Sequence, residues 1–119
     1  MKKTLVLGAS DNPNRYAYKT VISLQNHNHP VVPVGIRKGN INGLEVLRNK
    51  PLIKNVDTIT LYIGPRFQPD YYKYILELKP KRIIFNPGTE NKELSELAQS
   101  AGIEVLNACT LVMLSLGDF

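Results

Sequence analysis

Gly8, Ala9 and Ser10 form a candidate phosphate-binding loop directly after a short apolar run. A glycine at this point lets the backbone turn tightly and approach a pyrophosphate, and its small neighbours leave room for the ligand. The Ser10 hydroxyl can donate a hydrogen bond, and Arg15 is close enough along the chain to meet an anion. We expect the loop to open a helix whose free N–H groups add to anion binding. The spacing matches no complete glycine motif, so the prediction rests on the position of the loop between an expected strand and an expected helix.

Arg37 and Lys38 follow the second apolar run, where NAD sites place an acid that holds the ribose 2′-hydroxyl. That acid is missing in this chain. Two cations suit an adenosine ribose that carries a phosphate, which is the 2′-phosphate of NADP or the 3′-phosphate of coenzyme A (CoA). A solvated basic loop would have the same residues, so both interpretations stay open.

Residues that suggest an enzyme are few. His27 and His29 fall in a turn at the amino end of the expected sheet, and we interpret them as surface or capping residues. Cys109, the only cysteine, is either a buried structural thiol or the partner of a mixed disulfide with the thiol of the ligand. Asp11 is the only acid expected in the loops that form the cleft. We therefore expect no catalytic activity, and we expect no metal site.

Short apolar runs alternate with amphipathic segments along the whole chain. The runs 4–8, 31–35, 58–63, 82–86 and 103–107 predict strands, and the segments 14–26, 69–79, 91–101 and 108–116 predict helices. Residues 36–57 are expected to be irregular, with one short strand near 44–47. Alternation of this kind predicts an α/β fold, a Rossmann-like three-layer sandwich with a five-stranded parallel sheet in one domain, 1–119. Its ligand should bind at the carboxyl ends of the strands.

The composition is that of an ordinary globular protein with a basic balance. Of 119 residues, 43% are hydrophobic, and 15 Lys and Arg against 10 Asp and Glu give a net charge of +5. This balance favours an anionic partner. The cations are scattered along the sequence, which argues against nucleic acid. We find no apolar run of membrane-spanning length and no signal-peptide pattern, so we expect a cytoplasmic protein.

An ordered set of motifs resembles the standalone CoA-binding domain proteins, which are similar to the nucleotide-binding domain of the succinyl-CoA synthetase alpha subunit. The resemblance runs from Lys3 to Leu116. The motifs are Gly8-Ala9-Ser10 with Arg15, Pro33-Val34, Ile41-x-Gly43, Asn86-Pro87-Gly88-x-x-Asn91 and Cys109. It implies that the first loop holds the CoA phosphates and that residues 33–38 line the adenosine end. The loops 63–65, with Pro69, and 86–91 would line the rest of the pocket. The phosphohistidine of the synthetase belongs to a second domain that this chain lacks, so the resemblance implies binding without ligase activity.

We therefore expect a protein that binds CoA or a short acyl-CoA without catalysis of its own. An NADP-dependent oxidoreductase or an NADP-binding regulatory domain is the alternative. The expected partner is this small molecule, with no nucleic acid and no membrane, and a homodimer or an unknown protein partner stays open. Tyr16 is a candidate for packing on the adenine. The predicted ligand-binding residues are Gly8, Ala9, Ser10, Arg15, Tyr16, Pro33, Val34, Gly35, Ile36, Arg37, Lys38, Ile63, Gly64, Pro65, Pro69, Asn86, Pro87, Gly88, Asn91 and Cys109.

Overall fold

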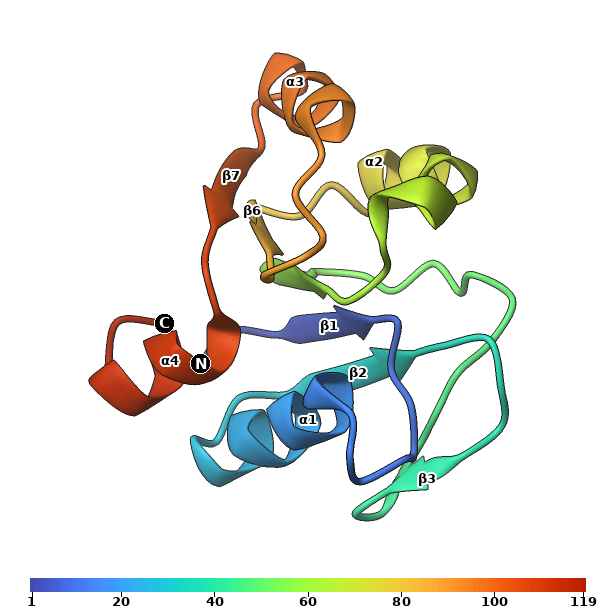
Figure 1. Ribbon diagram of the computed structural model, residues 1–119, viewed down its shortest axis with the longest axis vertical. Coiled ribbons are helices and arrows are strands. Elements are labelled where there is room, and N and C mark those ends of the chain that lie inside the picture. The colour runs from blue at the N-terminus through green and yellow to red at the C-terminus, as the bar shows by residue number, and fades with distance from the viewer.

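A five-stranded parallel sheet forms the centre of the computed structural model, which describes all residues 1–119. The strand order is β2-β1-β5-β6-β7. The strands are β1 (Thr4–Leu7), β2 (Val31–Val34), β5 (Thr58–Leu61), β6 (Arg82–Phe85) and β7 (Glu104–Asn107). The chain leaves β1 for β2 on one side and later enters β5 on the other, so the strand order reverses between β1 and β5 (Figure 1). The predicted Rossmann-like α/β fold with a five-stranded parallel sheet is confirmed.

Two pairs of helices cover the two faces of the sheet (Figure 1). Helices α1 (Tyr16–Asn26) and α4 (Thr110–Leu116) lie on one face, and α2 (Tyr72–Leu78) and α3 (Lys92–Ser100) lie on the other. Leu5 and Leu7 of β1 pack toward α2 and α3, whereas Val6 packs toward α1. Because both faces are covered, the strand is apolar at each of these positions. The longest helix has 11 residues, and none combines the length and apolar character needed to span a membrane.

Helices α1, α2 and α4 begin two or more residues later than the sequence predicts, α4 at Thr110 rather than at position 108. Helix α1 begins at Tyr16 rather than at position 14, so the loop after β1 is longer than expected. The segment expected as one helix from Pro69 begins with a 3-10 turn, η2 (Pro69–Tyr71), and becomes α-helical only at Tyr72. A second 3-10 turn, η1 (Pro65–Phe67), precedes it. A proline begins each turn, and each lacks the N–H that a continuous helix would need.

Residues 36–57 contain a β-hairpin instead of the single short strand near 44–47. Strands β3 (Asn40–Ile41) and β4 (Leu44–Glu45) pair antiparallel across Asn42 and Gly43, which have φ angles of +47° and +89°. Asn-Gly favours a two-residue hairpin turn because both residues accept positive φ. The fully buried Ile41 packs the hairpin against the α1 side of the sheet.

Candidate ligand-binding cleft

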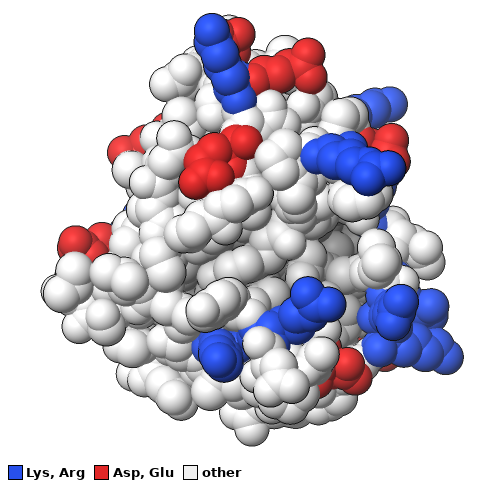
Figure 2. All heavy atoms as spheres, in the orientation of Figure 1, with Lys and Arg blue, Asp and Glu red and all other residues white.

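A cleft of about 810 Å³ opens at the carboxyl ends of the three neighbouring strands β2, β1 and β5. Its walls come from the β1–α1 loop, the segment after β2 and the segment after β5. Figure 2 shows this surface hollowed to the right of its centre, with Lys and Arg side chains on the lower and right-hand borders. The lining residues are Gly8, Ala9, Ser10, Asp11, Asn12, Arg15, Tyr16, Ala17, Gly35, Ile36, Arg37, Lys38, Tyr62, Ile63, Gly64, Phe67, Asp70 and Tyr71. The cleft therefore lies at the reversal of strand order, where Rossmann-like sheets bind their ligands.

The structure brings most of the predicted binding residues to this cleft. Those that line it are Gly8, Ala9, Ser10, Arg15, Tyr16, Gly35, Ile36, Arg37, Lys38, Ile63 and Gly64. Those that do not line it are Pro33, Val34, Pro65, Pro69, Asn86, Pro87, Gly88, Asn91 and Cys109. The last five follow β6 or β7, which lie two and three strands from β1, and neighbouring strands are about 4.8 Å apart. That these residues contact a ligand stays a prediction.

The N–H groups of Gly8 and Ala9 in the first loop are already used by the fold. Gly8 N and Ala9 N both donate to Val34 O, at 2.9 and 3.0 Å. Gly8 has a φ of +97°, and a Cβ atom on it would lie 2.8 Å from Tyr62 O. Glycine is therefore needed at this position because β5 passes close by, whether or not a ligand binds. That the Gly8 backbone also approaches a pyrophosphate stays a prediction.

The donors for an anion lie instead at the start of α1. Arg15 is the N-cap residue, and its side chain makes no capping hydrogen bond. The N–H groups of Tyr16, Ala17 and Tyr18 in the first turn donate to no acceptor in the protein. Tyr16 and Ala17 line the cleft, so this uncapped turn adjoins it. Free N–H groups and the helix dipole together favour an anion at this place.

Three exposed cations, Arg15, Arg37 and Lys38, stand around the same cleft. None of them takes part in an ion pair, because all three ion pairs of the protein involve other lysines. They approach the cleft from two elements, the β1–α1 loop and the segment after β2. A ligand with two separate phosphate groups would therefore meet Arg15 with one phosphate and Arg37 and Lys38 with the other.

Three further cations lie over aromatic rings that line the cleft. Lys19 lies 5.4 Å from the Tyr16 ring centre, Arg66 5.5 Å from Phe67, and Lys50 5.0 Å from Tyr71. The expectation that the cations are scattered holds for the sequence but not for this edge of the fold. A rim of this composition attracts anions and offers flat rings to a planar group.

The cleft contains a second acid that the sequence did not assign to it. Asp70 lines the cleft together with Asp11, so the expectation that Asp11 is the only acid is wrong. Asp70 belongs to the 3-10 turn that replaces the first part of the predicted helix. A helix running from Pro69 would have placed this residue differently, which is why the pattern did not reveal it.

Tyr62 is a half-buried residue that lines the cleft directly after β5. Its hydroxyl hydrogen bonds to Thr20 of α1, which is fully buried. Burial raises the pKa of Tyr62 to about 12, so the phenol is protonated at neutral pH. The sequence signal was available, because Tyr62 directly follows β5 as Gly8 follows β1.

Asn86 and Asn91 hold loops together rather than facing the cleft. Asn86 is 1% exposed; its Nδ2 donates to Thr60 Oγ1 at 2.7 Å and its Oδ1 accepts from Thr110 N at 2.9 Å. Asn91 Oδ1 caps α3 by accepting from Leu94 N at 3.2 Å. The two asparagines join β5, β6, α3 and α4 at the carboxyl edge.

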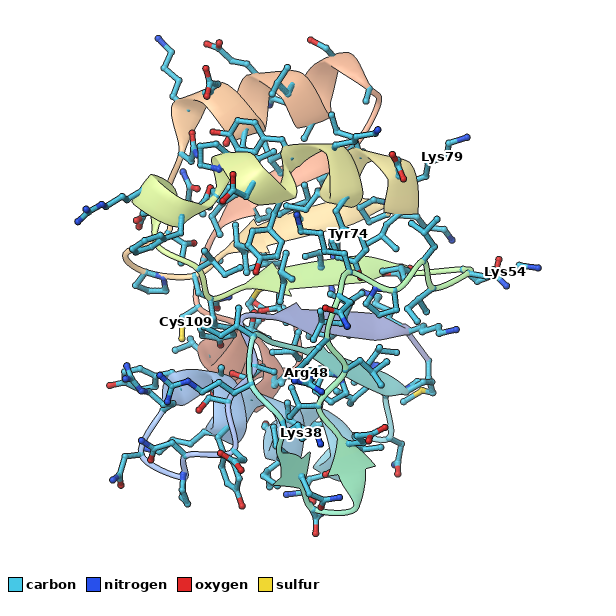
Figure 3. The ribbon with its side chains drawn as sticks, turned by 90° about the vertical axis from the view of Figure 1, so that its right-hand side faces the viewer. Lys38, Arg48, Lys54, Tyr74, Lys79 and Cys109 are labelled. Carbon is cyan, nitrogen blue, oxygen red and sulfur yellow. The ribbon has the colours of Figure 1, made fainter.

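Cys109 is half-buried and is the N-cap residue of α4. Figure 3 shows it at the carboxyl end of the strands, opposite Lys54 and Lys79 at the amino end. It is close enough to Tyr62 to contribute to the raised pKa of that phenol. Because the side chain is half-buried, the interpretation as a buried structural thiol is corrected, and the mixed disulfide stays a prediction.

The histidines lie where the sequence places them. His27 is the C-cap residue of α1, and His29 Nδ1 accepts a hydrogen bond from Lys2 N at 3.1 Å. Burial lowers the pKa of His29, which favours the neutral ring that this bond requires. Their structural role at the amino end of the sheet is confirmed. No group of three or more His, Cys, Asp or Glu side chains is arranged to hold a metal ion.

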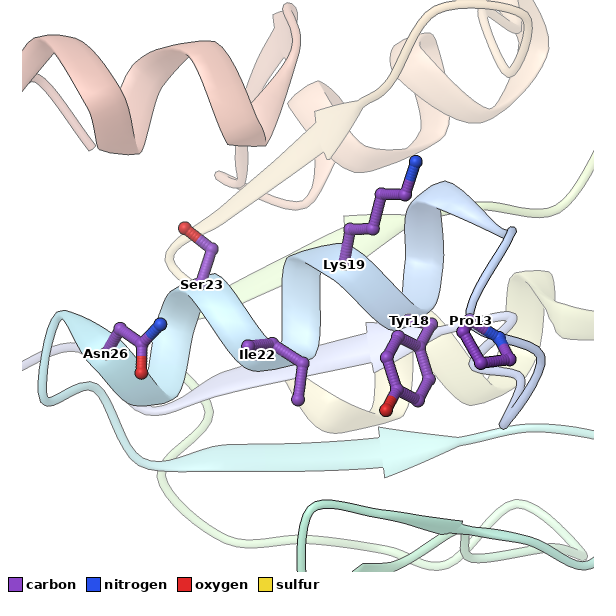
Figure 4. A pocket seen from close by; sticks show the side chains of 6 residues that line it. All are labelled: Pro13, Tyr18, Lys19, Ile22, Ser23 and Asn26. Atoms are coloured by element: carbon purple, nitrogen blue, oxygen red, sulfur yellow. The ribbon is translucent and has the colours of Figure 1, made fainter.

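A smaller hollow of about 270 Å³ lies along the outside of α1. It is lined by Pro13, Tyr18, Lys19, Ile22, Ser23 and Asn26. Figure 4 shows Lys19 and Ser23 on one side of the helix and Tyr18, Ile22 and Asn26 on the other. These side chains do not point toward a common centre, so the hollow is a weaker candidate than the cleft at the strand ends.

Comparison with known proteins identifies the family of this chain. A crystal structure of a protein described only as uncharacterized is 55% identical, with a TM-score of 0.98 over 100% of this chain and 98% of that one. A conserved hypothetical protein from Pyrococcus furiosus is 30% identical (TM-score 0.82; 94% and 98% covered), and a Thermus thermophilus protein is 26% identical (TM-score 0.86; 99% and 90% covered). No curated protein matches the sequence. The model of a CoA binding domain matches residues 2–115, so the chain belongs to the CoA binding domain family.

Proposed function

We propose that this protein binds CoA, or a short acyl-CoA, in the cleft at the carboxyl ends of β2, β1 and β5 and catalyses no reaction by itself. One observation supports the proposal independently of family membership. Three cations without ion-pair partners surround a helix start whose first-turn N–H groups donate to no acceptor. CoA carries a pyrophosphate and a 3′-phosphate, and it therefore offers an anion to each set of donors.

The fold suggests how CoA would lie. The pyrophosphate fits the uncapped turn at Tyr16 and Ala17, where Arg15 also stands. The ribose 3′-phosphate fits Arg37 and Lys38 after β2, on the side where Rossmann-like sheets hold the adenosine ribose. Tyr16 is 69% exposed at the rim and is free to pack on the adenine. The pantetheine then extends away from β2 toward the segment after β5.

The absence of turnover is part of the proposal. The Tyr62 phenol is neutral and hydrogen bonded to Thr20, and both histidines lie at the other end of the sheet. Incubation with CoA, ATP and a panel of short carboxylic acids should yield no acyl-CoA. Product that forms only in the presence of this chain would contradict a pure binding role.

A thermal-shift panel tests the choice of ligand. The panel contains CoA, acetyl-CoA, NADP, NAD and a short single-stranded oligonucleotide. A ligand at about 100 times its dissociation constant adds about 2.7 kcal/mol of stability, which raises the Tm of a domain this size by several degrees. We expect CoA and acetyl-CoA to give the largest shifts. A larger shift with NADP would favour the oxidoreductase or regulatory alternative, since Arg37 and Lys38 could also hold a 2′-phosphate.

A further inference from the structure

The wall of the cleft that follows β5 carries no cation that lines the cleft, unlike the other two walls. Its lining residues are Ile63, Gly64, Phe67, Asp70 and Tyr71, and we refer to the segment 63–71 as the β5 wall. The proposed phosphate-binding groups all belong to the β1–α1 loop, the first turn of α1 and the segment after β2. The β5 wall is therefore left without a role in binding phosphate.

Phe67 is the most unusual residue of the β5 wall, because 62% of its large apolar surface is exposed. Its ring contacts the guanidinium of Arg66 at 5.5 Å, and it belongs to neither apolar core cluster. Ile63 and Tyr71 are half-buried beside it on the same wall. An exposed aromatic side chain inside a cleft gains free energy when an apolar group covers it.

The backbone that presents Phe67 is held firmly from beneath. The next residue, Gln68, is fully buried, and its Nε2 donates to Ile63 O at 2.8 Å and to Thr89 O at 2.7 Å. Its Oε1 accepts from Asn91 Nδ2 at 2.8 Å. Pro65 and Pro69 on either side restrict the backbone further, because proline fixes φ. The β5 wall is thus preformed, so a ligand need not order it on binding.

The chemistry of CoA determines which part of it reaches this wall. With the 3′-phosphate at Arg37 and Lys38 and the pyrophosphate at the start of α1, the pantetheine continues across β1 toward β5. The sulfur and any acyl group on it are then the parts nearest to the β5 wall. This step rests on the proposed function.

We propose that the β5 wall is an acyl-binding site that selects CoA thioesters of apolar acyl groups, branched or aromatic. Phe67, Ile63 and Tyr71 provide the apolar surface. Asp70 lines the same wall and no cation does, so an acyl group that ends in a carboxylate finds no ion-pair partner among the lining residues. Lys50 and Arg66 lie outside the lining and already contact the rings of Tyr71 and Phe67.

Calorimetric titration with CoA, acetyl-CoA, isovaleryl-CoA, benzoyl-CoA and succinyl-CoA tests this site. We expect isovaleryl-CoA and benzoyl-CoA to bind about tenfold more tightly than CoA, as burial of a few apolar carbons predicts. Succinyl-CoA should bind no more tightly than CoA. In Phe67→Ala the tenfold preference should disappear, while the affinity for CoA itself changes less than about twofold. Leu116→Ala, which removes another exposed apolar side chain (71%) on α4, is the matched control and should keep the preference.

The outcomes separate this inference from the proposed function. If CoA binds and the apolar thioesters bind no more tightly, the acyl site is wrong and CoA binding stands. Tighter binding of succinyl-CoA than of isovaleryl-CoA would likewise overturn the apolar selectivity. An unchanged preference in Phe67→Ala would show that another wall holds the acyl group. If no member of the series binds, both the acyl site and the proposed function fail.

Discussion

Removal of the 3′-phosphate from CoA should weaken binding to this protein, and the loss should depend on Arg37 and Lys38. Both side chains are exposed at the rim of the cleft and have no ion-pair partner. A charge-assisted hydrogen bond contributes about 1.5–3 kcal/mol, and exposure to solvent and salt reduces that value. We therefore expect about 1–1.5 kcal/mol, which is roughly a five- to tenfold difference in affinity between CoA and dephospho-CoA.

A double-mutant cycle measures this coupling. The affinities of CoA and dephospho-CoA are determined by calorimetry for the wild type and for the double variant Arg37→Ala, Lys38→Ala. The difference between the ligands should close in the variant, because neither cation remains to recognise the phosphate. It should also shrink in the wild type as the salt concentration rises.

A matched control separates the local contact from net charge. The double variant Lys54→Ala, Lys81→Ala also removes two positive charges, but from the amino edge of the sheet, opposite the cleft. Figure 3 shows Lys54 at that end, and Lys81 directly precedes β6. This variant should keep the full difference between the ligands. Equal affinity of the wild type for CoA and dephospho-CoA would refute the reasoning. So would a control variant in which the affinity difference between the two ligands closes as it does in Arg37→Ala, Lys38→Ala.

Three further predictions concern the framework of the cleft. Gln68→Leu should destabilise the fold by about 2–4 kcal/mol in urea unfolding, since two carbonyl groups lose their donor; a change under 1 kcal/mol would contradict the importance of that contact. Asn91→Ala removes the α3 cap and should cost about 1 kcal/mol or more, whereas Asn91→Ser, which retains a capping oxygen, should cost less. Burial raises the pKa of Tyr74 to about 12, so the folded state favours the neutral phenol; its contribution to stability is present below pH 10 and is lost as the pH rises toward 12. The fall in unfolding free energy across pH 10–12 should be shallower in Tyr74→Phe, and an unchanged slope would contradict this assignment.

The sheet could be predicted because its strands are covered on both sides. In β1, β5 and β6 each residue is buried, so apart from Arg82 at the start of β6 the sequence shows short continuous runs of apolar or small side chains. The hairpin at Asn40–Glu45 was harder to predict, because each of its strands has two residues and shows no periodicity. Pro69 is compatible with the first position of a helix, and the apolar stripe that follows it predicts a helix from this residue, so the two 3-10 turns were not predicted.

The binding cleft was predictable only as far as strand order could be inferred. All five carboxyl ends meet at one edge, but only the ends of β2, β1 and β5 surround the cleft. The sequence does not reveal that β6 and β7 lie beyond β5. The predicted binding residues therefore extend to Asn86 after β6 and Cys109 after β7, which do not line the cleft. The same limit hid Phe67 and Asp70, whose side chains reach the cleft because the 3-10 turns point them there.

Gly8 first suggests a phosphate-binding loop, but a substitution at Gly8 is a poor test of phosphate binding. A Cβ atom at Gly8 would lie 2.8 Å from Tyr62 O and 3.0 Å from the Ile63 side chain, in a backbone with a φ of +97°. A valine there would force β1 and β5 apart at the point where both contribute to the cleft. Loss of CoA binding in that variant would follow from the distorted fold even if no phosphate ever lay near Gly8. Exposed side chains outside the apolar core, such as Arg37 and Phe67, can be removed with little effect on the fold, and the decisive variants of this cleft are therefore made at its rim.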